Sequence, residues 1–295
     1  MSDMIYGLIG KNISYSLSPV MHNAAFRYFG IPAEYRLFDM DEASLSVFLV
    51  GMLSDTLISG VNVTVPYKIK AMDVIARSVK GGVVDDGALA SNAVNTVVRE
   101  KGSLKGYNTD GRGFMESLAD DAGFSPRGKK VFLSGAGGAG NTICAHLASL
   151  KSEKPEVIFV WDVDNEKKCG LVRACNERYG AGSSVTVNKD DIVQKLEVSD
   201  LVVNATPLGT KAGDPLPFPV ERVKAGSIVY DLVYSRKTEV VKIARGRGAN
   251  ALDGSGMLAN QGAVAFSLWT GKPLKEVKTV MKKALLDALS SRSEG

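Results

Sequence analysis

The residues with the clearest chemical meaning are Gly135-Ala136-Gly137-Gly138-Ala139-Gly140, which fit the pattern G-x-G-x-x-G. An apolar run, residues 130–134, precedes them, and apolar residues at helical spacing follow. In such a unit the first glycine permits a tight turn, the second lets backbone N–H groups approach a pyrophosphate, and the third allows close helix–strand packing. The pattern predicts a dinucleotide site; the alternative is a glycine-rich turn that serves packing alone.

Asp162 stands at the end of the next apolar run, where a carboxylate can accept hydrogen bonds from both ribose hydroxyls of NAD. Val163 and Asp164 follow, so no arginine stands where a 2′-phosphate would need one. A carboxylate about 4 Å from a phosphate charge costs roughly 4 kcal/mol at an effective dielectric near 20. NAD is therefore favoured over NADP, unless Lys167 and Lys168 curl back; a solvated acid is the alternative reading of Asp162.

The two histidines are poor candidates for acid–base chemistry. His146 falls within a predicted helix, where packing or surface exposure is expected, and His22 is expected to be solvated or to cap a helix. Hydride transfer assisted by histidine is therefore disfavoured. The chain has no H-E-x-x-H or similar spacing, so no metal site is predicted.

Lysine and carboxylate side chains remain as acid–base groups. Lys68 follows an apolar strand, Asp110 lies among turn-forming residues, and Ser18 precedes a proline at a predicted helix start. From the residues alone, we expect Lys68 to be solvated, Asp110 to form an Asx-turn and Ser18 to be an N-cap. The residues alone thus indicate a dehydrogenase and leave its substrate open.

The surrounding elements alternate between strand and helix, which is typical of an α/β fold. In the first third we predict strands at 5–9 and 58–65, a helix at 19–29, an extended segment at 33–40 and a hairpin of 93–99 with 103–107. A regular series follows, with strands at 130–134, 157–162, 201–204 and 227–232 and helices at 139–150 and 166–179. Two helices, 257–270 and 274–290, end the chain.

These patterns predict two domains, since 295 residues exceed the usual size of a single core. Residues 111–255 are expected to form a Rossmann-type dinucleotide-binding domain. Residues 1–110 are expected to form an α/β domain that residues 256–295 rejoin, because the last helices can cover its apolar surface.

Composition excludes several classes of protein. The net charge is +4 and the basic residues are scattered, which argues against nucleic-acid binding. Cys144, Cys169 and Cys175 fall in predicted helices without metal or C-x-x-C spacing, and we interpret them as reduced core thiols. No window has the length and apolarity of a signal peptide or membrane span, so we expect a cytoplasmic protein that does not bind membranes.

Several separated motifs resemble those of shikimate dehydrogenases, in the same order. In the first third they are Ser16-Leu17-Ser18-Pro19, Asn62-Val63-Thr64-Val65-Pro66-Tyr67-Lys68, Ala93-Val94-Asn95-Thr96 and Asn108-Thr109-Asp110-Gly111. Beyond the glycine loop they are Asn204-Ala205-Thr206-Pro207-Leu208-Gly209, Asp231-Leu232-Val233-Tyr234 and Asp253-Gly254-Ser255-Gly256-Met257-Leu258, with Gln261. The resemblance covers nearly the whole chain.

The resemblance implies a role for each matching residue. Lys68 acts in catalysis, paired with Asp110. The substrate carboxylate and ring hydroxyls are held by Asp110 together with Ser16, Ser18, Asn62, Thr64, Asn95, Tyr234 and Gln261. The cofactor is held by the glycine loop and Asp162 together with Asn204, Thr206, Val233 and Gly256. The implied reaction is reversible hydride transfer between a nicotinamide and shikimate or 3-dehydroshikimate, as in aromatic amino acid biosynthesis, in a monomer or homodimer.

Cofactor and substrate choice stay open within the family. The resemblance implies an Asn-Arg-Thr pattern in NADP-dependent members at the position where this chain has Asp162-Val163-Asp164. This difference points towards NAD-linked relatives. Those relatives often act on quinate, yet quinate-preferring enzymes commonly have threonine where this chain keeps Ser18. Two alternatives are a dehydrogenase of a related acid such as aminoshikimate and a non-catalytic sensor of shikimate-type ligands. The presence of both Lys68 and Asp110 argues against the sensor.

Overall fold

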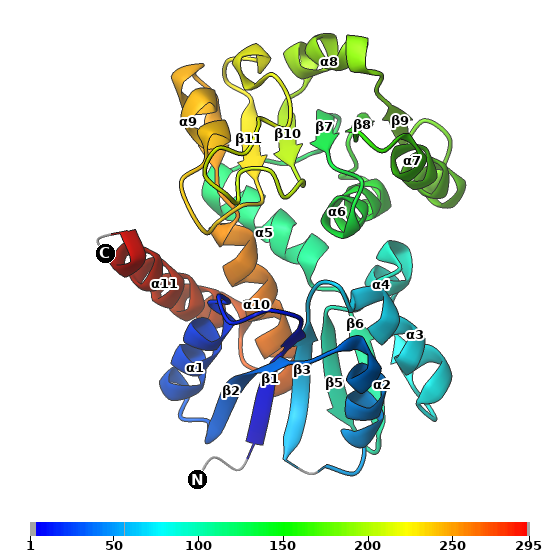
Figure 1. The fold of residues 1–295 in the computed structure, drawn as a ribbon, viewed down its shortest axis with the longest axis vertical. Coiled ribbons are helices and arrows are strands. Elements are labelled where there is room, and N and C mark those ends of the chain that lie inside the picture. Colours follow the sequence, from blue (N-terminus) through cyan, green and yellow to red (C-terminus); the bar gives the residue numbers. More distant parts are fainter. Residues whose placement is uncertain (1–3, 56, 294–295) are drawn as a thin grey trace. The chain divides into compact units, whose positions relative to one another are not determined.

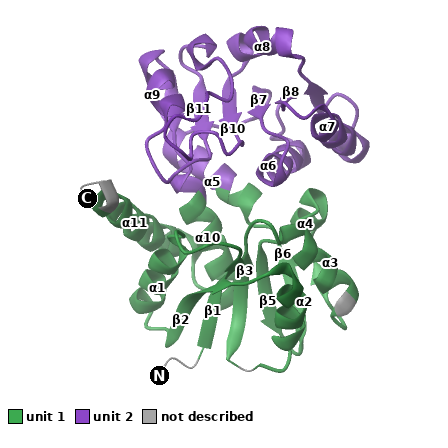
Figure 2. Ribbon diagram, viewed as in Figure 1, with its two compact units in different colours: residues 1–113, 258–295 green, residues 114–257 purple. Residues whose placement is uncertain are grey.

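The computed structural model describes residues 4–55 and 57–293, and the chain divides into two compact units. Unit 1 contains residues 1–113 and 258–295, and unit 2 contains residues 114–257 (Figure 2). The divisions fall inside helices α5 (Asp110–Ala122) and α10 (Ser255–Thr270). The predicted domain segments include residues 1–3, 56 and 294–295, which lie outside the described residues.

Within its described residues, unit 1 is built on a mixed sheet of order β2-β1-β3-β5-β6-β4 (Figure 1). Its strands are β1 (Met4–Gly10), β2 (Ala33–Asp39), β3 (Ile58–Val63), β4 (Val83–Val84), β5 (Thr96–Glu100) and β6 (Ser103–Tyr107). β1 pairs in parallel with β2 and β3, whereas β5 runs antiparallel to β3 and β6. Lys101 and Gly102 have φ values of 45° and 78°, which suit a tight hairpin turn.

Helices cover both faces of this sheet. On one face, α2 (Glu42–Gly51) and α3 (Lys68–Ser78) pack their apolar residues against Ile9, Val61 and Val63. On the other face, Tyr6 and Tyr35 meet aromatic residues of α1 (Ser18–Tyr28) and α10. The short α4 (Asp86–Ser91) precedes β5, and α11 (Leu274–Ser293) packs on α1.

Unit 2 is a parallel sheet of order β12-β11-β10-β7-β8-β9 over its described residues. Its strands are β7 (Lys130–Ser134), β8 (Val157–Trp161), β9 (Ser184–Thr186), β10 (Leu201–Asn204), β11 (Ile228–Asp231) and β12 (Asn250–Leu252). Within unit 2, successive strands run from β7 through β8 to β9 at one edge of the sheet, and the chain then returns to β10 on the other side of β7. This reversal is the topology in which nucleotides bind at the carboxyl ends of the strands.

Both faces of the unit 2 sheet are buried, which explains why its strands are continuous apolar runs. Consecutive residues of β7, such as Val131 and Phe132, belong to core clusters on opposite faces of the sheet. One face packs against α5, α6 (Gly138–Ser149) and α7 (Asn165–Tyr179). The other packs against α8 (Ile192–Val198) and α9 (Glu239–Gly246), and the predicted α/β class is confirmed.

The structure corrects some sequence predictions. The strand expected at 58–65 ends at Val63, and the one expected to begin at residue 93 begins at Thr96. Helix α5 was not predicted, because Gly111 and Gly113 in its first turn weaken the helical pattern. Cys144 and Cys175 are buried, but Cys169 is exposed and is not a core thiol.

His22 is neither solvated nor a cap, contrary to the prediction. Its side chain is fully buried on the aromatic face of unit 1, and neither ring nitrogen has a hydrogen-bond partner. The ring stacks on Tyr35 with centroids 4.1 Å apart and planes 2° from parallel. Burial lowers the pKa of His22 from 6.5 to about 3, so the ring is neutral at physiological pH.

This burial predicts a specific pH dependence of stability. The unfolded chain takes up a proton at His22 near pH 6.5, whereas the folded chain resists protonation down to about pH 3. The free energy of unfolding should therefore fall as pH drops from 6.5, by about 2 kcal/mol at pH 5 from this group. Urea unfolding at pH 7 and pH 5 should show a smaller decrease for His22→Phe, which keeps an aromatic ring beside Tyr35. Equal decreases in both proteins would contradict the assignment.

Candidate functional site

Lys68 and Asp110 form an ion pair in unit 1, with Lys68 Nζ 2.6 Å from Asp110 Oδ2. Lys68 is the first residue of α3 and Asp110 the first of α5, so two helix starts meet here. The side chains are 24% and 10% exposed, so both are largely but not completely buried. The expectation of a solvated Lys68 is therefore wrong. The turn beside Asp110 is made by Asn108, whose Oδ1 accepts from the Asp110 N–H at 3.0 Å.

Asn95 holds the other oxygen of the Asp110 carboxylate. Its Nδ2 donates to Asp110 Oδ1 at 2.8 Å, and its Oδ1 accepts from the Thr109 N–H at 2.8 Å. Thr96 Oγ1 donates to the same Asn95 oxygen at 2.9 Å and accepts from Asn62 Nδ2 at 3.0 Å. These side chains are nearly inaccessible to solvent, so the network holds the Asp110 carboxylate from its buried side.

The network continues from Asn62 to Tyr35 on β2. Tyr35 Oη donates to Asn62 Oδ1 at 2.8 Å. In the loop before α1, Ser16 Oγ donates to Ser18 Oγ at 3.2 Å. Ser18 is not the predicted N-cap, because Leu17 occupies that position and makes no side-chain capping bond. One chain of hydrogen bonds thus joins Tyr35 to Lys68, and Ser16 and Ser18 are bonded to each other.

Two further predicted residues of unit 1 lie on neighbouring elements. Thr64 follows β3 and bonds through its backbone to Ile9 O at 2.9 Å. Gln261 lies on α10, where its Nε2 donates to Leu258 O at 2.9 Å. A Cβ at Gly113 would fall 2.5 Å from Gln261 N, so the glycine lets α5 and α10 approach within one turn of Asp110.

Three members of the network were not predicted as site residues: Tyr35, Thr96 and Thr109. The two threonines are part of motifs that the resemblance singles out, so their neighbours along the chain were a usable signal. Tyr35 lies outside those motifs in a strand of mixed residues. Nothing local distinguishes it from any other buried tyrosine, and its place in the network depends on Asn62, 27 residues away.

The glycine loop of unit 2 connects β7 to α6 as predicted for a dinucleotide site. Gly135 has a φ of 106°, and a Cβ there would fall 2.8 Å from Ala205 C. A Cβ at Gly140 would fall 1.9 Å from Gly135 O, so the turn closes only with glycine. Gly137 and Gly138 meet no atom within 4 Å and leave the start of α6 open. The N–H groups there suit an anionic pyrophosphate.

Asp162 follows β8 and reaches back to the glycine loop. Its Oδ2 accepts from the Ala136 N–H at 2.7 Å and its Oδ1 from the Asp164 N–H at 2.8 Å. A carboxylate oxygen can accept more than one bond, so both remain able to take ribose hydroxyls. Lys168 is buried and donates to Val187 O at 2.9 Å, while Lys167 pairs with Asp164 at 3.2 Å. Neither lysine is directed at Asp162.

The loops after β10 and β11 are joined through two buried side chains. Asn204 Nδ2 donates to Asp231 Oδ1 at 2.9 Å, and Thr238 Oγ1 donates to Asp231 Oδ2 at 2.5 Å. Burial raises the pKa of Asp231, and these hydrogen bonds oppose the rise. Asn204 Oδ1 accepts from the Thr206 N–H and hydroxyl. Asn204 is fully buried, so its side chain shapes the loop from beneath.

The remaining predicted residues of unit 2 lie near these loops. Val233 is buried, and its N–H donates to Asp231 Oδ1 at 3.2 Å. Gly256 lies in α10, where a Cβ would fall 2.2 Å from Ser117 Oγ. Tyr234, predicted to bind substrate, belongs to unit 2 rather than to the network of unit 1.

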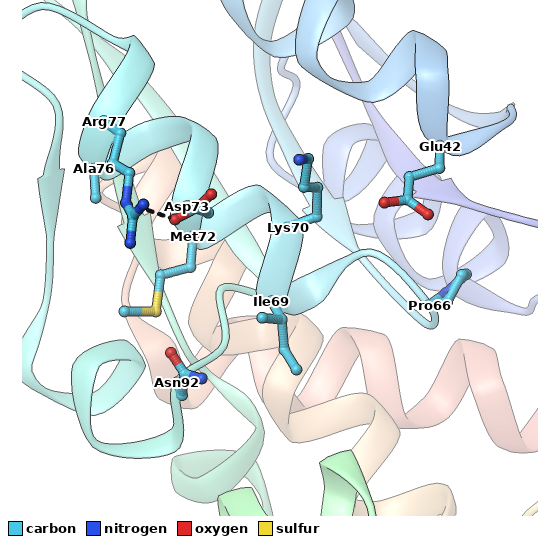
Figure 3. Close-up of a pocket in the computed structure, with 9 residues that line it drawn as sticks. All are labelled: Glu42, Pro66, Ile69, Lys70, Met72, Asp73, Ala76, Arg77 and Asn92. Atoms are coloured by element: carbon cyan, nitrogen blue, oxygen red, sulfur yellow. Dashed lines mark ion pairs between the residues drawn. The ribbon is translucent and has the colours of Figure 1, made fainter.

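A pocket of about 550 Å³ lies along α3, bordered by Glu42, Pro66, Lys70 and Arg77 (Figure 3). Arg77 pairs with Asp73 there at 2.8 Å. None of the predicted site residues lines this pocket, although Ile69 beside Lys68 does. The predicted site residues of unit 1 therefore lie outside this pocket.

Comparison with known proteins identifies the family. A sequence profile of the shikimate dehydrogenase substrate binding domain matches residues 8–97, and one of the shikimate 5′-dehydrogenase C-terminal domain matches residues 254–286. The chain is 36% identical over 289 residues to shikimate dehydrogenase (NADP(+)) of Geobacillus kaustophilus, covering 97% of this chain and 99% of that protein. The chain belongs to the shikimate dehydrogenase family. The resemblance seen in the motifs is confirmed.

Two solved structures of similar proteins contain NAD, and one of them also contains shikimate. Shikimate 5-dehydrogenase from Listeria monocytogenes, in complex with shikimate and NAD, is 31% identical with a TM-score of 0.83, covering 94% of this chain and 96% of that one. Quinate dehydrogenase from Corynebacterium glutamicum, in complex with NAD, is 30% identical with a TM-score of 0.82, covering 94% and 98%. This shikimate dehydrogenase family member is thus a nicotinamide-dependent oxidoreductase.

Across residues 4–55 and 57–293, no helix is long and apolar enough to cross a bilayer.

Proposed function

We propose that this protein interconverts shikimate and 3-dehydroshikimate, with NAD as the preferred nicotinamide. The observation that carries the proposal is the 2.6 Å pair of Lys68 and Asp110, held in a buried network that also includes Asn95 and Asn62. An ammonium beside a fixed carboxylate suits proton transfer at an alcohol or ketone oxygen. Hydroxyl and amide groups farther along the network suit a polyhydroxylated carboxylic acid.

The roles of the unit 1 residues follow from their chemistry. In reduction, the Lys68 ammonium donates a proton to the ketone oxygen, and in oxidation the neutral amine takes the hydroxyl proton. Asp110 holds the Lys68 Nζ in place and accepts a hydrogen bond from a ring hydroxyl. The nicotinamide, when bound, supplies or takes up the hydride. Each turnover thus moves one proton through Lys68, which then exchanges it with water.

Residues of the network and of neighbouring elements are proposed to orient the substrate. Ser16 and Ser18 donate to the carboxylate, while Asn62, Thr64, Asn95 and Gln261 hold ring hydroxyls. Residues 1–110 with 256–295 are then the substrate domain and residues 111–255 the dinucleotide domain. Tyr234 is proposed as a substrate contact from the dinucleotide domain. The cytoplasmic location and the monomeric or homodimeric state stay predictions.

NAD is proposed because of the charges beside the ribose position. The glycine loop fits a pyrophosphate, and Asp162 is fixed where ribose hydroxyls would lie. Lys168 is tied to Val187 and Lys167 pairs with Asp164, so neither lysine offsets the charge of Asp162. Several curated relatives are named for NADP(+), so the preference rests on these residues of this chain. Thr206, Val233 and Gly256 complete the proposed cofactor site.

The first test is initial-rate assay of shikimate and quinate oxidation, each with NAD and with NADP, followed by absorbance of the reduced nicotinamide. We expect turnover of shikimate with NAD at a higher kcat/KM than with NADP. Turnover of quinate is the second expectation, supported by the similarity to an NAD-bound quinate dehydrogenase. Binding of shikimate without turnover in any pairing would contradict the proposal and favour the sensor, whereas activity on aminoshikimate alone would favour the related acid.

The proton-transfer role predicts the effect of Lys68→Ala. The variant should lose roughly a hundredfold to ten-thousandfold in kcat with little change in substrate affinity, since a positioned acid–base group contributes about that much. Lys70→Ala is the matched control, because Lys70 is an exposed lysine on the same helix. Wild-type activity in Lys68→Ala, or an equal loss in Lys70→Ala, would remove Lys68 from the mechanism.

The cofactor assignment predicts a gain of function in Asp162→Asn with Val163→Arg. Removing one carboxylate and adding a guanidinium should raise kcat/KM for NADP by at least about tenfold. The oxygen of the introduced asparagine can still accept from the Ala136 N–H, although the bond from the Asp164 N–H is lost. Val163 is 90% exposed, so we expect the fold to tolerate both changes. Val163→Arg alone is the control and should gain less, because Asp162 remains. No gain in the double variant would show that the ribose site is misplaced.

A further inference from the structure

Thr238 lies outside the motifs that indicate the cofactor site, yet its side chain bonds to one of them. Its Oγ1 donates to Asp231 Oδ2 at 2.5 Å and, as the N-cap of α9, accepts from the Val241 N–H at 3.3 Å. Thr238 and Asp231 are both buried. One hydroxyl therefore joins the start of α9 to the end of β11 away from solvent.

Asp231 extends this connection to two loops. Its Oδ1 accepts from Asn204 Nδ2 at 2.9 Å and from the Val233 N–H at 3.2 Å, while its Oδ2 accepts from Thr238. Asn204 Oδ1 in turn accepts from the Thr206 N–H at 3.1 Å and from the Thr206 hydroxyl at 2.7 Å. The orientation of one carboxylate thus bears on the loop after β10 and on the loop after β11.

The loop after β10 also packs against the glycine loop and against Thr238. The Ala205 N–H donates to Ser134 O at 2.7 Å, and a Cβ at Gly135 would fall 2.8 Å from Ala205 C. Farther along, Gly209 has a φ of 103°, and a Cβ there would fall 3.2 Å from Thr238 Cγ2. One part of the loop is therefore packed on the turn at Gly135 and another on Thr238.

The strand order indicates which half of a dinucleotide these loops would meet. β8 lies on one side of β7, and β10 and β11 lie on the other. A dinucleotide crosses the carboxyl ends of the strands where their order reverses, with its pyrophosphate at the glycine loop. In the proposed cofactor site Asp162, after β8, holds the adenosine ribose. The loops after β10 and β11 are then on the side of the nicotinamide half.

We infer that Thr238 is a positioning residue that acts through Asp231 to order the loops beside the nicotinamide half of the dinucleotide. This inference rests on the proposed function and adds a residue to it. Without the Thr238 hydroxyl, Asp231 Oδ2 would lose its donor in a buried place, which is costly for a carboxylate. Rotation of the carboxylate towards other donors would disturb its bonds to Asn204 and Val233. The adenosine half, on the side of β8, does not depend on these bonds.

The test compares Thr238→Ala with Thr238→Ser in the full-length protein, because these two variants differ only in the hydroxyl. Calorimetric titration should show that NAD binds about fivefold to tenfold more weakly to Thr238→Ala than to Thr238→Ser. AMP, which contains only the adenosine half with one phosphate, should compete for the site with the same affinity in both variants. Equal NAD affinities, or a parallel weakening of NAD and AMP, would overturn the inference.

Ser199→Ala is the matched control for a loss of stability in unit 2. The Ser199 hydroxyl is buried and donates to Lys195 O at 2.7 Å, just before β10 begins and therefore at the opposite end of that strand from the loops. This variant should leave NAD affinity unchanged. A loss as large as that of Thr238→Ala would show that lowered stability, and not positioning, is the cause.

A double-variant cycle separates the bond to Asp231 from the cap of α9. Asp231→Asn keeps an oxygen for the bonds that Oδ1 accepts and removes the acceptor of the Thr238 hydroxyl. Thr238→Ala should therefore weaken NAD binding less in the Asp231→Asn background than in the wild type. The same fold-loss in both backgrounds would assign the effect to the cap of α9 and overturn the route through Asp231.

The titrations need no acid substrate, so they distinguish this inference from the proposed function. Weaker NAD binding to Thr238→Ala than to Thr238→Ser would support positioning even if the wild type oxidised neither shikimate nor quinate, and only the proposed substrate would be wrong. Equal binding to the two variants alongside an active wild type would overturn the positioning role alone. A wild type that binds neither NAD nor NADP would overturn both.

Discussion

The candidate site of unit 1 depends on the rule that buried polar groups need partners. Asp110 places a carboxylate almost out of water, and two donors of different kinds hold it, the Lys68 ammonium and the Asn95 amide. Asn95 in turn is satisfied by Thr96 and Thr109. Because each member satisfies the next, a displacement of any one would leave another unpaired at a cost of about 1–3 kcal/mol. The site is rigid for the same reason that it is stable.

Unit 2 uses the same device with a different outcome. Asp231 is fully buried at the end of a strand, and Asn204, Thr238 and the Val233 N–H supply its donors. No lysine takes part in these bonds, so the Asp231 carboxylate joins loops without an ion pair. A buried carboxylate is thus held by hydrogen bonds in both units. In unit 1 its partners are side chains, and one of them is a lysine.

Much of the fold could be predicted because its signals are local. The glycine loop, Asp162 and the apolar runs at 130–134 and 157–162 lie within about thirty residues of one another and obey strict spacing rules. The site of unit 1 could be predicted only through the resemblance, because Lys68 and Asp110 lie 42 residues apart. Taken singly, Lys68, Asp110 and Ser18 have ordinary structural explanations, which their contacts in the folded chain replace. His22 was misjudged because a polar residue type predicts exposure, whereas a flat ring stacked on Tyr35 can remain neutral inside a core.

Cofactor choice can be separated from the rest of this architecture. The loop that would hold the pyrophosphate relies on glycines and backbone N–H groups, which cannot distinguish NAD from NADP. Discrimination falls to the few residues after β8, and among them Asp162 is the one bonded to the glycine loop. In the proposed cofactor site Asp162 thus has two functions, since it both fixes the loop and excludes a second phosphate. A change of cofactor must preserve an acceptor for Ala136 while removing the charge. Asparagine is isosteric and meets both conditions, at the cost of the bond that Asp162 accepts from the Asp164 N–H.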